Sequence, residues 1–158
     1  MEKIAVIGAG QMGNGIAQVA ASAGYDVLMV DIKQDFVDKG LSTIEKSLSK
    51  LVSKERMTQS DANDTLARIS TSIDRNDCRD ADLVVEAVPE VLDLKTSIFA
   101  ELDKICKPEC ILASNTSSIS ISTIANSTTR PDKVIGMHFM NPVPIMKLVE
   151  IINGDKTS

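Results

Sequence analysis

The sequence has no tryptophan, a single histidine (His138) and only three cysteines (Cys78, Cys106 and Cys110). An odd number of cysteines without a paired C-x-x-C spacing predicts reduced thiols, and one histidine does not favour a metal site. No apolar run approaches the roughly 20 residues that a membrane-spanning helix requires. The first predicted strand begins at Lys3, which leaves no room for a signal or transit peptide. We therefore expect a cytoplasmic protein without a bound metal ion and without membrane contact.

The sequence also has no excess of basic residues. The 158 residues include 17 basic and 22 acidic side chains, which gives a net charge of −5 and does not favour a nucleic-acid surface. Hydrophobic residues make up 43% and charged residues 25%, the ordinary composition of a globular domain with its own core. We expect one domain over residues 1–158.

The most informative stretch is residues 3–31. A short apolar run, residues 4–7, leads into the G-x-G-x-x-G pattern Gly8, Gly10, Gly13; an alanine-rich helical stretch and a second apolar run then end at Asp31. This is a βαβ unit in which the dinucleotide-binding pattern stands in its proper context. The fingerprint residues predicted to bind a cofactor are Gly8, Gly10, Gln11, Met12 and Gly13.

Each fingerprint glycine has its own physical task. Gly8 allows the tight turn after the strand, Gly10 lets the backbone approach a pyrophosphate, and Gly13 lets the helix pack closely on the sheet. Asp31 is placed to accept hydrogen bonds from the adenosine ribose. A 2′-phosphate at that position would meet a like charge, so Asp31 favours NAD over NADP.

Strand-like and helical segments alternate along the rest of the chain. Strands are predicted at 4–7, 27–30, 69–73, 83–88, 111–114, 133–139 and 147–152, and helices from the fingerprint to about 24, then at about 34–56, 58–68, 92–105 and 120–125. The alternation predicts an α/β, Rossmann-type, doubly wound and mostly parallel sheet. Two successive helices over 34–68 exceed what a simple crossover requires, so we expect them to form a projecting helical hairpin.

In such sheets, ligands bind beyond the carboxyl ends of the strands. His138 lies near one strand end, and Glu150 lies on the neighbouring final strand, so the two can form an imidazole–carboxylate pair suited to proton transfer. Without such a partner, His138 would be read as a core histidine. Asn115 and Ser117 follow another strand; turn and N-cap chemistry is an equally good interpretation of that segment.

Four segments of the sequence, GAGQMGNGIA, VVEAVPE, ASNTSS and GMHFMNPVPIMKLVEII, resemble those of the short-chain L-3-hydroxyacyl-CoA dehydrogenases, and of the bacterial 3-hydroxybutyryl-CoA dehydrogenases in particular. The resemblance covers the whole chain. It implies an NAD-dependent oxidation of a 3-hydroxyacyl-CoA to the 3-oxoacyl-CoA, or the reverse reaction.

The resemblance also implies a role for each matching residue. His138 would be the catalytic acid/base and Glu150 its orienting carboxylate, while Ser117 and Asn141 would hold the substrate oxygen and the nicotinamide side. The remaining implied contacts are, for NAD, Glu90, Lys95 and Asn115, and for CoA, Ser47, Lys54 and again Lys95. Family members continue with a helical domain that completes the substrate site and forms a homodimer, which we expect after residue 158.

Two other functions stay open at this point. A non-catalytic NAD-binding module would keep the fingerprint without any use for His138 and Glu150. A 3-hydroxyacid dehydrogenase that acts on free acids would share the fold and the cofactor. A hydrolase is not favoured, because the sequence has no G-x-S-x-G motif.

Overall fold

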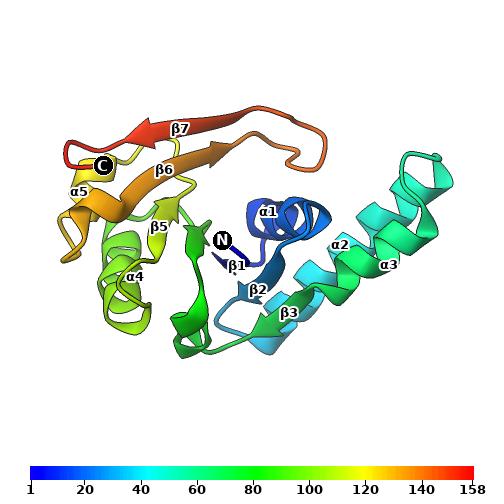
Figure 1. Cartoon of the computed structure of the whole chain (residues 1–158), viewed down its shortest axis with the longest axis horizontal. Coiled ribbons are helices and arrows are strands. Elements are labelled where there is room, and N and C mark those ends of the chain that lie inside the picture. Colours follow the sequence, from blue (N-terminus) through cyan, green and yellow to red (C-terminus); the bar gives the residue numbers. More distant parts are fainter.

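The computed structural model describes residues 1–158 and has one sheet at its centre. Its strands are β1 (Lys3–Ile7), β2 (Asp26–Val30), β3 (Ile69–Ser72), β4 (Leu83–Glu86), β5 (Ile111–Ser114), β6 (Val134–Phe139) and β7 (Val149–Asn153). They lie in the order β3-β2-β1-β4-β5-β6-β7 (Figure 1). All neighbouring pairs are parallel except β6 with β7, which is antiparallel. This order confirms the doubly wound, mostly parallel sheet.

Helices cover both faces of the sheet. They are α1 (Gln11–Ser22), α2 (Gln34–Ser53), α3 (Gln59–Ala67), α4 (Leu92–Ile105) and α5 (Ile121–Ala125), with two short 3₁₀ helices, η1 (Arg75–Asp80) and η2 (Pro131–Lys133). In Figure 1, α1 lies on one side of the sheet and α4 lies on the other. None of the helices combines the length and the apolar character that crossing a membrane requires.

Strand β1 shows why its sequence is apolar at successive positions. Ile4 and Val6 pack into the core beneath α1, whereas Ala5 and Ile7 pack into the core beneath α4. Because side chains alternate between the two faces of a strand, a strand covered on both sides has to be apolar throughout. The apolar run over residues 4–7 therefore predicts that helices cover both faces of the sheet.

The helical hairpin formed by α2 and α3 projects beyond the sheet (Figure 1). Thr58 caps α3 by accepting a hydrogen bond from the Asp61 N–H at 3.1 Å, as the sequence predicts. The buried side of α2 consists of Val37, Gly40, Ile44 and Leu48. These positions recur at helical spacing, so the hairpin packs against α1 and shares the core that contains Ile4 and Val6.

Several element ends differ by one to three residues from the predicted ones, and two of the differences have a clear cause. Helix α2 ends at Ser53 and not at residue 56, because Glu55 adopts a left-handed conformation (φ 58°) that a helix cannot continue through. Strand β4 ends at Glu86, two residues before the predicted end. There the Glu86 carboxylate accepts the Val88 N–H at 2.7 Å, and that bond turns the backbone away from the sheet.

Arg130 holds the far end of α4. Its Nε donates to the Asp103 carboxylate at 2.7 Å, and its two terminal nitrogens donate to the carbonyls of Asp103, Cys106, Lys107 and Cys110 at 2.7–3.1 Å. The ion-paired side chains are only 10% and 7% exposed. Burial raises the pKa of the Asp103 carboxyl, but hydrogen bonds from Thr129 and Arg130 outweigh burial and hold that pKa below its ordinary value.

We expect Arg130→Met to lower the free energy of unfolding by about 3–5 kcal/mol, because a buried carboxylate and several helix-end carbonyls lose their donor. Urea unfolding at pH 7 measures the loss. Arg75→Met is the matched control, since the side chains of the Arg75–Glu101 pair are 28% and 43% exposed and such a pair is worth less than about 1 kcal/mol. An equal loss in both variants would contradict the assignment.

The same pair sets a dependence on pH. The pKa of Asp103 is depressed in the folded protein, so its stabilising contribution is complete above the unfolded-state pKa and disappears as the pH falls through the folded-state value. The stability of the Arg130→Met variant should therefore fall less steeply in acid than that of the parent protein.

Candidate active site

The fingerprint loop is tightly packed at Gly8 and Gly13 and open at Gly10. The Gly8 N–H donates to the Val30 carbonyl at 2.7 Å, and Gly8 has a φ of +109° that favours glycine. A Cβ added to Gly13 would lie 1.9 Å from the Gly8 carbonyl oxygen. A Cβ on Gly10, in contrast, would meet no atom within 4 Å. Gly10 therefore faces open space at the start of α1, where the first-turn N–H groups have no helical partner.

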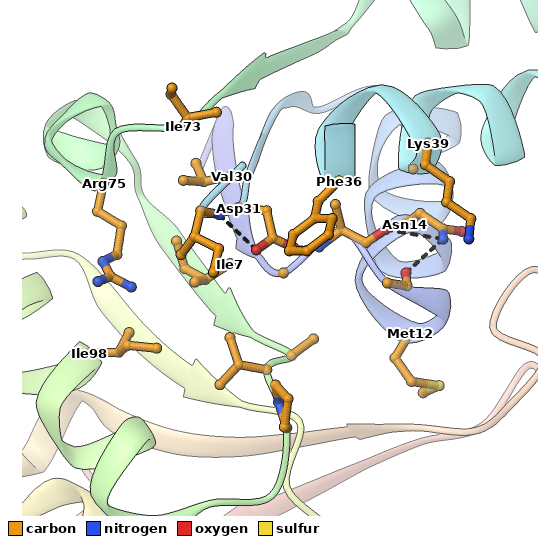
Figure 2. Close-up of a pocket in the computed structure, with 18 of the residues that line it drawn as sticks. Ile7, Met12, Asn14, Val30, Asp31, Phe36, Lys39, Ile73, Arg75 and Ile98 are labelled. Atoms are coloured by element: carbon orange, nitrogen blue, oxygen red, sulfur yellow. Dashed lines mark hydrogen bonds between the residues drawn. The ribbon is translucent and has the colours of Figure 1, made fainter. Parts of the chain in front are cut away.

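A large cavity of about 1080 Å³ opens beside this loop. Asp31 is one of the residues that line it (Figure 2). Its carboxylate accepts the Ala9 N–H at 2.8 Å and the Ile32 N–H at 2.7 Å. Ile7, Val30, Ile73 and Ile98 lie at one end of the cavity, and Arg75 lies among them (Figure 2). Apolar side chains with a guanidinium, a fixed carboxylate and a bare Gly10 fit an adenine, its ribose and a pyrophosphate in that order.

A smaller cavity of about 320 Å³ continues from the large one, with Met12, Ala87, Val88 and Pro89 lining both. Its other lining residues are Glu90, Lys95, Asn115, Ser117, His138, Phe139, Met140 and Asn141. The predicted catalytic residues His138, Ser117 and Asn141 thus meet in one cavity that adjoins the predicted cofactor site. Glu150, the fourth predicted catalytic residue, does not line the cavity and lies beside His138.

His138 and Glu150 are directly opposite each other in the β6–β7 pairing. His138 Nδ1 lies 3.9 Å from Glu150 Oε1, and the Glu150 side chain is 53% exposed. His138 is the second-last residue of β6 and Glu150 is the second residue of β7, so both lie near strand ends, and β7 runs antiparallel to β6. The antiparallel return is what brings the carboxylate to the imidazole.

Some of the polar side chains around His138 already make hydrogen bonds within the protein, and one does not. The Asn115 amide oxygen accepts the Phe139 N–H at 2.8 Å, so this side chain holds the end of β6. The Asn141 amide oxygen accepts from Gln11 Nε2 at 3.1 Å, a link across 130 positions of the chain. The Ser117 hydroxyl makes no hydrogen bond within the protein, which leaves it free for a ligand in the cavity.

The family of the chain follows from a comparison of its sequence with family models. Residues 3–158 match the model described as "3-hydroxyacyl-CoA dehydrogenase, NAD binding domain". The chain belongs to this family. NAD is accordingly its cofactor, in agreement with the fingerprint, Asp31 and the large cavity.

Individual family members agree closely. A probable 3-hydroxybutyryl-CoA dehydrogenase of Deinococcus radiodurans is 56% identical over 157 residues, which are 99% of this chain and 56% of that protein. The crystal structure of (S)-3-hydroxybutyryl-CoA dehydrogenase from Ralstonia eutropha matches with a TM-score of 0.98 and 48% identity, over 100% of this chain and 56% of that one. Mitochondrial hydroxyacyl-coenzyme A dehydrogenase of Sus scrofa is 46% identical over 164 aligned residues. The chain thus spans about half the length of these relatives.

Two of the contacts implied by the family resemblance lie away from both cavities. Ser47 and Lys54 are on the hairpin; Lys54 is exposed at the end of α2, and Ser47 is partly buried. The structure does not bring them to the site, so their contact with CoA stays a prediction. The same helix does reach the large cavity at its other end, through Phe36, Lys39, Gly40 and Thr43, which sequence reasoning missed.

The ammonium of Lys95 is paired within the protein, and the implied contacts of Lys95 with NAD and CoA stay predictions. The sequence interpretation gave it contacts with both NAD and CoA, but its side chain is only 1% exposed and its ammonium pairs with Glu86 and Glu90 at 2.6 and 2.9 Å. Its third hydrogen goes to the Val88 carbonyl at 3.2 Å. An ammonium has three hydrogens, so Lys95 lines the smaller cavity without a donor to offer a ligand.

Proposed function

We propose that the protein carrying this chain oxidises an L-3-hydroxyacyl-CoA, with 3-hydroxybutyryl-CoA as the reference substrate, to the 3-oxoacyl-CoA and catalyses the reverse reaction. The observation that carries the proposal is the position of His138, which lies in the cavity adjoining the NAD cavity and opposite a carboxylate. Nothing in a purely nucleotide-binding module requires that pairing. Three buried, unpaired cysteines support a reducing compartment such as the cytoplasm.

The residues of the smaller cavity divide the work. His138 takes the proton of the 3-hydroxyl as the alcohol is oxidised and returns it in the reduction, and Glu150 favours the imidazolium that forms. The free Ser117 hydroxyl and the Asn141 amide hold the substrate oxygen near His138. Bound NAD supplies the hydride acceptor, and the protein supplies alignment and the proton.

The substrate side of the site is proposed to extend beyond this chain. We infer that a helical domain, as expected from the family resemblance, covers the smaller cavity and forms a homodimer, and that the hairpin residues Ser47 and Lys54 contact CoA. On this proposal the 158 residues alone bind NAD but turn over poorly. A chimera that joins them to the segment following the matched region in the Deinococcus radiodurans relative should be active.

The test compares two oxidants of NADH with this chimera. Acetoacetyl-CoA should be reduced, with a loss of absorbance at 340 nm, and free acetoacetate at the same concentration should be reduced at less than a tenth of that rate. The binding energy of the CoA part is then used to align the reacting carbonyl, which the free acid does not provide. Equal rates would assign the protein to the dehydrogenases of free 3-hydroxyacids.

A further inference from the structure

A buried charge network lies behind the smaller cavity, at the carboxyl ends of β4 and β5. Glu86 is fully buried and is bound by three donors: its Oε2 accepts from Lys95 Nζ at 2.6 Å and from the Val88 N–H at 2.7 Å, and its Oε1 accepts from Ser114 Oγ at 2.6 Å. An ammonium and a backbone N–H can only donate, so Glu86 Oε2 is the acceptor of both bonds.

Glu90 is the member of the network that reaches the cavity surface, with a side chain 41% exposed. Its Oε1 lies 2.9 Å from Lys95 Nζ, and its Oε2 accepts from Thr116 Oγ1 at 2.6 Å and from Ser118 Oγ at 3.0 Å. Burial raises the pKa of Glu90, but the hydrogen bonds from Thr116, Lys95 and Ser118 outweigh burial and lower that pKa to about 2. Glu90 is therefore ionised and held in one orientation at neutral pH.

The charges of the network do not cancel. Glu86 and Glu90 contribute two negative charges against the one positive charge of Lys95. No other lysine and no arginine lines the smaller cavity, and its only other titratable side chain is His138. The wall formed by the β4–α4 connection therefore carries one net negative charge, fixed by hydrogen bonds on every carboxylate oxygen.

We propose that this network sets the relative affinity of the protein for oxidised and reduced cofactor. The inference rests on the proposed function, in which the nicotinamide enters the smaller cavity beside His138. The nicotinamide ring carries a positive charge in NAD⁺ and none in NADH. A fixed negative charge in a partly desolvated wall attracts the first ring and leaves the second nearly unaffected. The network thus favours binding of the oxidised form.

The test measures the dissociation constants of NAD⁺ and NADH by isothermal titration calorimetry at low salt, with the 158-residue chain and no acyl-CoA. In Glu90→Gln and Glu86→Gln, the ratio Kd(NAD⁺)/Kd(NADH) should rise roughly three- to tenfold, the size of a unit-charge interaction through partly solvated protein. Glu109→Gln, an exposed site that lines neither cavity, changes the net charge equally and should leave the ratio unchanged.

A purely structural network would give a different result. If Glu90→Gln weakened both cofactor forms equally, or left both unchanged, the proposal would be overturned. Glu86 is buried and its variant is the one at risk of unfolding, so the partly exposed Glu90 suffices for this decision. The calorimetric titration does not measure turnover, so it is independent of the chimera assay. A shifted ratio together with an inactive chimera would overturn the dehydrogenase proposal alone. An unchanged ratio with an active chimera would overturn only the inference about charge.

Discussion

Replacing His138 with glutamine in the chimera is expected to lower the rate of acetoacetyl-CoA reduction by about 10²–10⁴-fold, the usual contribution of a positioned acid/base. Glutamine keeps the size and the hydrogen-bonding groups but cannot exchange a proton at neutral pH. The fingerprint and Asp31, where we place most of the NAD contacts, lie in the large cavity, which His138 does not line, so the affinity for NAD should stay within about twofold of the parent value. Steady-state assays at 340 nm and calorimetric titration with NAD measure the two quantities.

Glu150→Gln is the graded comparison for this variant. Its carboxylate lies 3.9 Å from the imidazole and is half exposed, so it acts through His138 and its loss should cost less rate than the loss of His138 itself. If the His138→Gln enzyme retained its rate, or if its NAD affinity fell in step with the rate, the acid/base role would have to be given up.

A methyl group added at Gly13 should destabilise the fold strongly, whereas one added at Gly10 should hardly change its stability. Gly13→Ala would place its Cβ 1.9 Å from the Gly8 carbonyl oxygen, and both groups are backbone-fixed between β1 and α1. We expect a loss of more than about 4 kcal/mol in the free energy of unfolding, which is exceptional for a single methyl group. Gly10→Ala meets no protein atom within 4 Å and should fold with nearly parental stability.

Gly10→Ala, which should hardly change stability, should weaken the binding of the cofactor. The open space beside Gly10 is where we place the pyrophosphate, so Gly10→Ala should weaken NAD binding by at least about tenfold, or ~1.4 kcal/mol. Urea unfolding and calorimetric titration separate the two effects. A Gly10→Ala protein that bound NAD normally would show that the pyrophosphate lies elsewhere.

Much of this arrangement could be predicted because it depends on local signals. The fingerprint glycines and Asp31 are separated by the length of one βαβ unit, and α4 begins and ends at the predicted residues, 92 and 105. Alternating strands and helices gave the sheet, because buried parallel strands are apolar on both faces. His138 could be singled out because it is the only histidine of the chain and lies near a strand end.

The features that sequence reasoning missed depend on contacts between distant segments. The direction of β7 is not encoded in its own pattern, since a return over residues 140–148 can place it either way. Lys95 stands between apolar residues of α4 and was expected to reach a ligand, whereas Glu86 and Glu90 bury and occupy its ammonium. The η1 helix was missed because it is a short capped turn, in which Asp74 accepts the Asn76 N–H, without a repeating apolar pattern.

The Gln11–Asn141 hydrogen bond and the pairing of β6 with β7 also bear on the order in which the two cavities arise during protein synthesis. All residues that line the large cavity lie between positions 7 and 101, whereas the small one includes His138 and Asn141 and is complete only after β7 has added Glu150. Domains fold as units during synthesis, and the core beneath α1 contains Val143 together with Val6 and Ile16. The nucleotide cradle and the seat of the imidazole therefore form together, once the ribosome has released the last strand.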